Sequence, residues 1–133
     1  MPSQDLDQFD RVLVWFRRDL RLDDHTALSL ALQHAKHVHA AFVFDTAILD
    51  KLPRQDRRVA FIHASLQELD AAWRERAADD AAGLVVRHGQ AAHEVVVLAQ
   101  QLGVQAVFTH HDDEPEALAR DAQVRGSLAN HGI

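Results

Sequence analysis

The feature that most constrains the fold is the alternation of short apolar runs with longer segments of helical periodicity. The first run, VLVWF at residues 12–16, is continuous and rich in β-branched and aromatic residues, which is typical of a strand buried on both faces. Three similar runs follow, each separated from the next by a helical segment. We therefore predict strands at residues 12–16, 38–44, 84–88 and 104–110, and helices at residues 25–35, 59–78, 91–102 and 115–130.

Local signals support the predicted helices. Asp24 is a good N-cap for the first helix, Gly103 suits the C-cap of the third, and Pro115 suits the first turn of the fourth. Apolar residues recur at helical spacing in the first two helices. The predicted stripes are Leu28, Leu32 and Ala35 on the first helix, and Val59, Ile62, Leu66, Leu69 and Trp73 on the second.

Strands that alternate with helices predict an α/β fold, a Rossmann-like, doubly wound parallel sheet with helices on both faces. We expect one α/β domain at residues 11–133, preceded by a flexible N-terminal tail at residues 1–10. The chain stops where a fifth strand would be expected, which predicts a fragment of a longer protein.

The composition excludes several classes of site. The chain has no cysteine, which excludes a disulfide framework, a zinc–thiolate centre and a cysteine nucleophile. The formal net charge of −6 argues against autonomous DNA binding, because such proteins usually carry a basic surface. No apolar run is long enough to span a bilayer, so we predict a cytoplasmic protein without membrane contact.

Two charged loops lie where an open parallel sheet binds ligands, beyond the carboxyl ends of its strands. Residues 17–24 hold three arginines and three aspartates. Two interpretations stay open: an internal network of ion pairs, or an arginine fork that holds an anion or a polar ring. The loop has no glycine, so the G-x-G-x-x-G approach to a dinucleotide pyrophosphate is missing.

The second charged loop contains His110, His111, Asp112 and Asp113, which are metal ligands by residue type. Consecutive side chains of an extended segment point to opposite sides, so we predict a solvated polar loop and no metal site. We predict no catalytic residue elsewhere in the chain. Trp15 and Trp73 occupy core-like positions, and we interpret both as packing residues rather than electron relays.

Two stretches resemble signatures of the DNA photolyase and cryptochrome family. LVWFRRDLRLDDHTAL at residues 13–28 resembles its opening strand followed by F-R-x-D-L-R-x-x-D-N/H-x-A-L, and DDEPEALARD at residues 112–121 resembles D-x-E-P-x-x-x-x-R-D. The resemblance implies the N-terminal domain of a deoxyribodipyrimidine photolyase, which binds a light-harvesting antenna pigment. In such proteins a C-terminal helical domain holds FAD and the flipped pyrimidine dimer, and an electron from light-excited reduced FAD splits the dimer.

The resemblance also implies where the antenna lies, by the loops after the first, second and fourth strands. The family's folate-type pattern often has Asn-Glu soon after the glutamate of the second motif, whereas this chain has Glu116-Ala117. A deazaflavin-type antenna is therefore favoured over folate, and FAD and DNA belong to the helical domain. The implied cofactor-binding residues are Arg17, Asp45, Asp112 and Glu114.

The family strand order, 3-2-1-4-5, carries two further expectations. Asp121 shares an apolar helical stripe with Val124 and Leu128, and a buried carboxylate needs a partner. This order brings the last helix next to the first loop, so we predict that Asp121 pairs with an arginine of that loop, Arg17, Arg18 or Arg21. With the fifth strand missing, the fourth strand is an open edge, which predicts self-association.

Two alternatives remain beside the photolyase interpretation. A cryptochrome blue-light photoreceptor shares the same domain, and nothing in these residues separates the two. A universal-stress-type nucleotide-binding module would need a glycine-rich phosphate loop after the fourth strand, and residues 110–115 contain no glycine.

Overall fold

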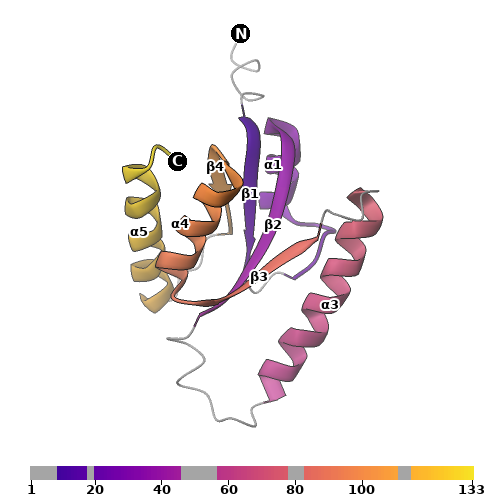
Figure 1. Ribbon diagram of the computed structural model, residues 1–133. Coiled ribbons are helices and arrows are strands. Elements are labelled where there is room, and N and C mark those ends of the chain that lie inside the picture. Colours follow the sequence, from indigo (N-terminus) through magenta and orange to yellow (C-terminus); the bar gives the residue numbers. More distant parts are fainter. Residues whose placement is uncertain (1–8, 18–19, 46–56, 78–82, 111–114) are drawn as a thin grey trace.

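The computed structural model describes residues 9–17, 20–45, 57–77, 83–110 and 115–133. Within these ranges four strands alternate with four helices, as the sequence predicts (Figure 1). None of the described helices is both long enough and apolar enough to cross a membrane. The strands are β1 (Phe9–Phe16), β2 (Ala35–Asp45), β3 (Leu84–Gly89) and β4 (Ala106–Phe108), and the helices are α1 (Thr26–His34), α3 (Arg57–Ala77), α4 (Ala91–Leu102) and α5 (Pro115–Asn130).

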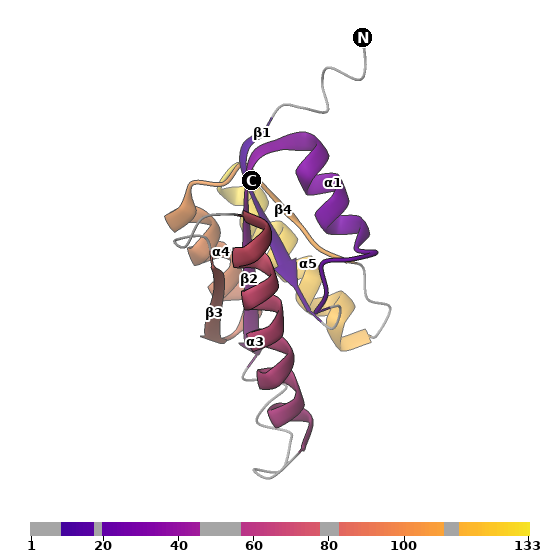
Figure 2. The same cartoon turned by 90° about the vertical axis from the view of Figure 1, so that its right-hand side faces the viewer.

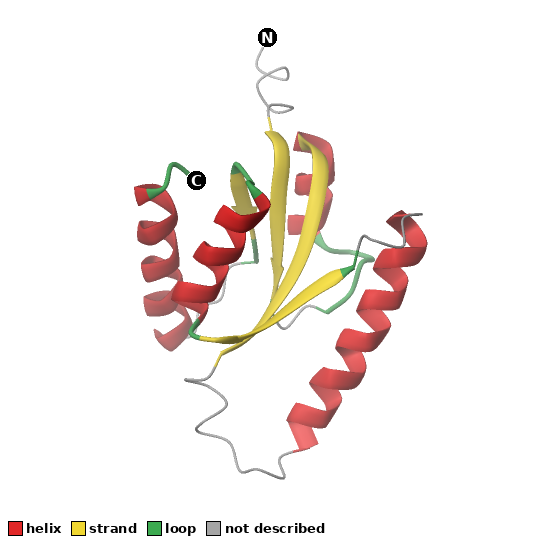
Figure 3. Cartoon of the chain, in the orientation of Figure 1, coloured by secondary structure: helices red, strands yellow, loops and turns green. Residues whose placement is uncertain are grey.

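The strands form one parallel sheet in the order β3-β2-β1-β4, which confirms the predicted fold class and the predicted order (Figure 3). The central strand β1 pairs with β2 along its length and with β4 over three residue pairs. The helices lie on both faces, and Figure 2 shows α1 and α4 on opposite sides of the sheet. This arrangement brings the carboxyl ends of all four strands to one edge.

Alternate residues of β1 supply the core on both faces of the sheet. Leu13 and Trp15 pack with residues of α4 and α5, whereas Val12, Val14 and Phe16 pack with residues of α1 and α3. All five side chains are at most 5% exposed. The continuous apolar run of the sequence is therefore a strand buried on both faces, as predicted.

The second and third predicted helices are confirmed. α4 has the predicted bounds and ends at Gly103, whose left-handed φ of 69° lets its N–H reach the carbonyls of Ala99 and Gln100. On α3, Leu66, Leu69 and Trp73 are buried, Ile62 is half-buried, and the side chain of Val59 lies outside the described residues. Burial of Trp15 and Trp73 confirms that both are packing residues.

The start of the first helix differs from the prediction, because its N-cap is His25 rather than Asp24. Asp24 has a left-handed φ of 52°, a conformation that aspartate tolerates in turns. His25 is extended, as an N-cap requires, and its Nδ1 accepts the Leu28 N–H at 3.0 Å. The ring of His25 therefore supplies the N-cap acceptor that was predicted to be the carboxylate of Asp24.

The first helix also ends earlier than its apolar pattern predicts. Ala35 is not on its buried face but is the first residue of β2, where it pairs with Phe9 of β1. The second strand thus begins at Ala35 rather than Val38, and Leu32 of the predicted stripe is 60% exposed. The helix instead buries Ala27, Leu28 and Ala31.

The fourth strand is shorter than predicted. Val104 lies just past the Gly103 cap of α4, where its N–H donates to the Ala99 carbonyl. The N–H of Gln105 donates to the carbonyl oxygen of Arg11, and regular pairing begins at the next residue, Ala106. After Phe108 the chain is held by a side chain rather than by the ladder, as described below.

Candidate functional site

The carboxyl edge of the sheet is the candidate site, at the lower end of the strands in Figure 1. Two of the four predicted cofactor-binding residues, Arg17 and Asp45, stand directly at the ends of β1 and β2. The other two, Asp112 and Glu114, lie outside the described residues. Within the described part of the chain, no group of three or more His, Asp or Glu side chains is arranged to hold a metal ion.

Arg17 forms a buried ion pair with Asp121 of α5, which confirms the predicted link between the two motifs. One guanidinium nitrogen lies 2.8 Å from Asp121 Oδ2 and 3.2 Å from the carbonyl oxygen of His110, and both charged side chains are 11% exposed. The guanidinium also stacks over the Trp15 ring, 4.7 Å from its centroid. Arg17 therefore joins β1, α5 and the residue after β4.

The gap between the ends of β1 and β4 is closed by further contacts. The hydroxyl of Thr109 donates to the carbonyl of Trp15 at 2.8 Å and continues the link between the two strands beyond the ladder. Sheet topology changes direction here, and in an open α/β sheet this is where ligands usually enter. In this protein Arg17 and Thr109 link the two strand ends at this position.

Asp45 makes a second buried ion pair with α5. Its Oδ2 lies 2.8 Å from Nε of Arg120, and the same oxygen accepts the N–H of Ala91, the first residue of α4, at 3.4 Å. A carboxylate at this point is also stabilised by the positive N-terminal end of the α4 dipole. The adjacent residues Arg120 and Asp121 thus hold the ends of two neighbouring strands, β2 and β1.

Sequence reasoning missed the role of Arg120, because on the helix it points away from the apolar stripe that contains Asp121. The available signal was the adjacency itself. An arginine and an aspartate at consecutive positions of a helix near a sheet edge can reach two neighbouring strand ends, provided that each end offers the opposite charge.

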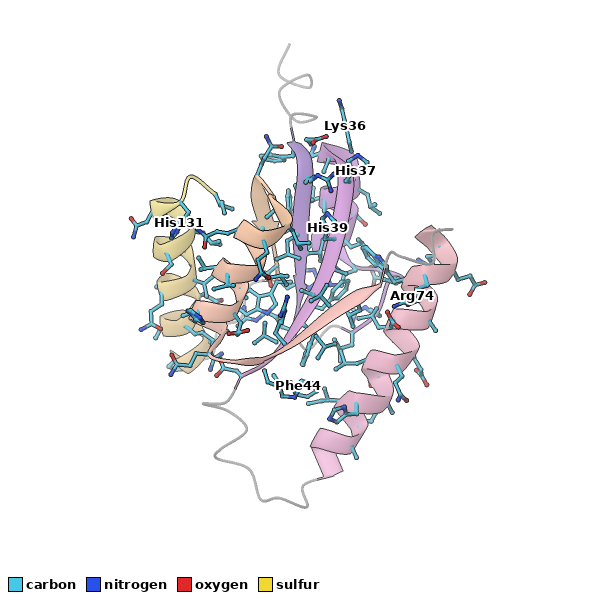
Figure 4. The ribbon with its side chains drawn as sticks, in the orientation of Figure 1. Lys36, His37, His39, Phe44, Arg74 and His131 are labelled. Atoms are coloured by element: carbon cyan, nitrogen blue, oxygen red, sulfur yellow. The ribbon has the colours of Figure 1, made fainter. Side chains whose placement is uncertain are left out.

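A stack of aromatic rings marks the β2–β3 side of the edge. Phe44 is buried, and its ring stacks on His88 of β3 at 4.7 Å and tilts against His63 of α3 at 4.9 Å (Figure 4). Both histidines are exposed. The alternation of Phe44 and Asp45 along β2 sends the ring towards α3 and the carboxylate towards α4 and α5.

The described charges of the first loop form an internal network, which agrees with one of the two interpretations the sequence left open. Arg21 donates two hydrogen bonds to the Asp24 carbonyl, at 3.2 and 3.3 Å, and Asp23 pairs with Arg76 of α3 at 2.8 Å. Arg18 and Asp19 lie outside the described residues. The charges described here are therefore used to fix the loop against its own backbone and against α3.

A cleft of about 520 Å³ lies beside β4, between α1 and α5. It runs along the side of β4 that has no strand partner in the described sheet. Its walls are mainly apolar, with polar groups at the carboxyl end of the strand. The lining includes Leu30 of α1, Phe108, Thr109 and His110 from the end of β4, and Val124, Arg125 and Leu128 of α5.

Comparison with known proteins gives a consistent result. Residues 12–133 match the family model of DNA photolyase. The deoxyribodipyrimidine photo-lyase of Synechococcus sp. is 35% identical over 122 residues, covering 92% of this chain and 24% of that protein. A cryptochrome DASH from Natronomonas pharaonis is 32% identical, covering 93% of this chain and 26% of that protein. The chain thus spans about a quarter of the length of these relatives.

Solved structures agree with the sequence comparisons. The archaeal photolyase of Sulfolobus tokodaii, described with two FAD molecules and the implication of a novel light-harvesting cofactor, superposes with a TM-score of 0.81 at 31% identity, over 92% of this chain and 28% of that one. A universal stress protein from Pseudomonas aeruginosa reaches a TM-score of 0.50 at 13% identity, which shows a shared fold alone. With the family model matched over the whole α/β fold, the chain belongs to the DNA photolyase family.

Proposed function

We propose that this chain is the light-harvesting domain of a cytoplasmic deoxyribodipyrimidine photolyase, which repairs cyclobutane pyrimidine dimers with light and FAD. The observation that carries the proposal is the family match over residues 12–133, on a sheet whose strand ends are fixed by the motif residues themselves. Its partner is a C-terminal helical domain, which would hold FAD and contact DNA. The acidic net charge of −6 agrees with DNA contact outside this domain.

The antenna chromophore would lie beyond the ends of β1, β2 and β4. Arg17 and Asp45 already hold α5 through ion pairs. Their role in the proposed site is to fix the points from which the first and second loops leave the sheet. Asp112 and Glu114 would contact the chromophore more directly, as the family resemblance implies.

We propose a deazaflavin-type chromophore in preference to folate, because the second motif reads D-D-E-P-E-A without the Asn-Glu pair. The Sulfolobus photolyase, described with two FAD molecules, makes FAD the main competitor. Fluorescence titration of the purified chain with 8-hydroxy-5-deazaflavin, FAD and methenyltetrahydrofolate decides among them. Tightest binding of the deazaflavin is expected, and tighter binding of either other compound would overturn this choice.

Repair itself is tested on the full-length protein. We expect it to split thymine dimers in light and to lose this activity in the dark. A cryptochrome photoreceptor, the alternative that the 32% identical cryptochrome DASH keeps open, would bind FAD and leave the dimers intact. The 133-residue chain on its own is expected to show neither repair nor one FAD per chain, which an absorbance spectrum and a repair assay together measure.

We also propose that the chain self-associates through the open side of β4, with a second copy as the occupant. Leu30 is 41% exposed and lines the cleft beside this strand. Sedimentation at several concentrations should show a dimer that Leu30→Glu abolishes. Leu32→Glu is the matched control, because Leu32 is 60% exposed on the same helix but does not line the cleft. A monomer at every concentration would contradict the proposal.

A further inference from the structure

Two stacked histidine rings from distant parts of the chain cap the start of α1. Nδ1 of His25 accepts the N–H of Leu28 at 3.0 Å, and Nε2 of His110 accepts the N–H of Ala27 at 3.2 Å. The rings are nearly parallel, at 15°, with centroids 4.1 Å apart. Since the first N–H groups of a helix have no partner within the helix, the pair satisfies two of them.

This arrangement requires both ring nitrogens to be acceptors. A neutral imidazole has one acceptor nitrogen, so His25 carries its proton on Nε2 and His110 carries its proton on Nδ1. An imidazolium has two donors and no acceptor. A second proton on either ring therefore breaks one of the two cap hydrogen bonds, because the ring would then present an N–H to a backbone N–H.

The described charges near the pair are engaged with other groups or lie at the positive end of the helix. The first turn of α1 has no acidic residue, and the start of a helix carries a partial positive charge. Asp121 is already paired with Arg17, which also donates to the His110 carbonyl, and Asp23 is paired with Arg76. Within the described residues, the charged side chains near the pair include Arg17, Arg21, Asp23, Asp24, Arg76, Asp121 and Arg125.

The pair also links the loop after β1 to the segment after β4, at the start of α1. His25 closes the loop after β1, and His110 is the second residue after β4. The Arg17–Asp121 pair fixes α5 to this edge, whereas the histidines fix α1 to it. On one face an ion pair therefore fixes α5 to the β1–β4 edge, and on the other face two neutral histidine rings fix α1 to it.

We propose that His25 and His110 form a proton-sensitive clasp that positions the start of α1 against the end of β4, and that antenna binding weakens when the clasp is protonated. This inference rests on the proposed function. A proton added to either ring removes its acceptor nitrogen, so acidification opens the clasp. His25 and His110 are positioning residues, because they act on the chromophore through the loops they hold.

The direct test is hydrogen exchange of the Ala27 and Leu28 amides in the 133-residue chain, expressed as protection factors between about pH 7.5 and about pH 5. Protection should fall by about fivefold or more, which corresponds to the loss of one cap hydrogen bond. The amide of Glu94 is the internal control, because it donates to the Gln90 carbonyl and involves no ring. Equal loss of protection at Glu94 would overturn the proposal.

The matched variant is H25N/H110Q, which places amide oxygens near the positions of the two acceptor nitrogens and does not titrate. Its protection factors at Ala27 and Leu28 should change by less than about twofold over the same pH range. If they fall as in the unmodified chain, the clasp is not the cause and the proposal is wrong. Circular dichroism at both pH values shows whether the variant remains folded.

A second readout separates the clasp from the proposed function. Binding of 8-hydroxy-5-deazaflavin should weaken at about pH 5 in the unmodified chain and stay constant in H25N/H110Q. Unchanged binding in a chain whose clasp opens would overturn the positioning role. Absence of binding at every pH, with the protection change intact, would instead count against the proposed antenna while supporting the clasp.

Discussion

The two halves of the sheet's carboxyl edge are built differently. On the β1–β4 side, Arg17, Thr109 and the stacked histidines close the space between the strands with buried contacts. On the β2–β3 side, the described contacts are the Asp45–Arg120 pair and the ring of Phe44, flanked by two exposed histidines. The first half links β1, β4, α1 and α5 to one another, whereas on the second half the exposed groups are His63 and His88.

A dense run of charges in a sequence can therefore serve to hold parts of one chain together. The most charged segment of the chain, residues 17–24, lies at the closed half, and its described charges bind other parts of the same chain. The Arg120-Asp121 pair of the second motif is likewise used for fixing strand ends. Four predictions test the comparison, in order of decreasing effect.

The largest effect is expected at the closed half. Asp121→Ala leaves the buried Arg17 guanidinium without its carboxylate, and removing one partner of a buried pair costs about 3 kcal/mol of unfolding free energy or more. Urea unfolding measures the change. Gln123→Ala on the exposed side of α5 is the control and should stay within about 0.5 kcal/mol. A loss below about 1 kcal/mol for Asp121→Ala would show that the ion pair is not structural.

The corresponding change at the other half should be smaller, and its two partners should differ. Asp45→Ala removes the partner of Arg120 and an acceptor for Ala91 N–H, whereas Arg120→Ala leaves Asp45 with that N–H and the α4 dipole. We expect about 2 kcal/mol for Asp45→Ala and about 1 kcal/mol for Arg120→Ala in urea unfolding. The reverse order would contradict the assignment of Asp45 as the common acceptor.

A smaller effect is expected where β3 ends. Gly89 has a φ of 151°, and a Cβ there would lie 2.8 Å from Cγ of Glu94. Gly89→Ala should destabilise the chain by about 1–2 kcal/mol, from backbone strain and from this contact. Gly103→Ala isolates the strain, because its φ is also positive, at 69°, with no atom within 4 Å of the added Cβ. A Glu94→Ala background should lower the cost of Gly89→Ala if the contact matters.

The order of the strands and helices could be predicted from the sequence more fully than the contacts at the ends of these elements. Strand order, the bounds of α4 and the Arg17–Asp121 pair all followed from periodicity or from the family motifs. The N-cap at His25 did not, because Asp24 is the more common N-cap residue type, and the end of α1 did not, because it depends on the pairing of Ala35 with the distant Phe9. Only the fold shows that His110 reaches Ala27 or that Ala35 pairs with Phe9.

The smallest effect concerns the opposite end of the sheet, where His39 stands near the start of β2 (Figure 4). Its Nε2 lies 3.4 Å from a guanidinium nitrogen of Arg11, across the β1–β2 pairing. Burial, followed by the charges of Arg11 and His37, lowers the pKa of His39 below its usual value of 6.5. The folded chain therefore resists protonation at this residue more than the unfolded chain does.

The sign of the pH dependence follows from that difference. As the pH falls through the usual value of about 6.5, residue 39 of the unfolded chain takes up a proton before the folded chain does, so acidification lowers the unfolding free energy. The loss is complete once the pH has passed below the lowered pKa of His39. His39→Gln should remove this pH dependence of the unfolding free energy and leave the part due to the histidine clasp. The difference between the two pH profiles therefore isolates the contribution of His39.

Arg11→Ala should raise the pKa of His39 in an NMR titration, because burial and His37 would then act without the guanidinium. An unchanged pKa of His39 in Arg11→Ala would mean that the Arg11 guanidinium does not act on His39 across the β1–β2 pairing.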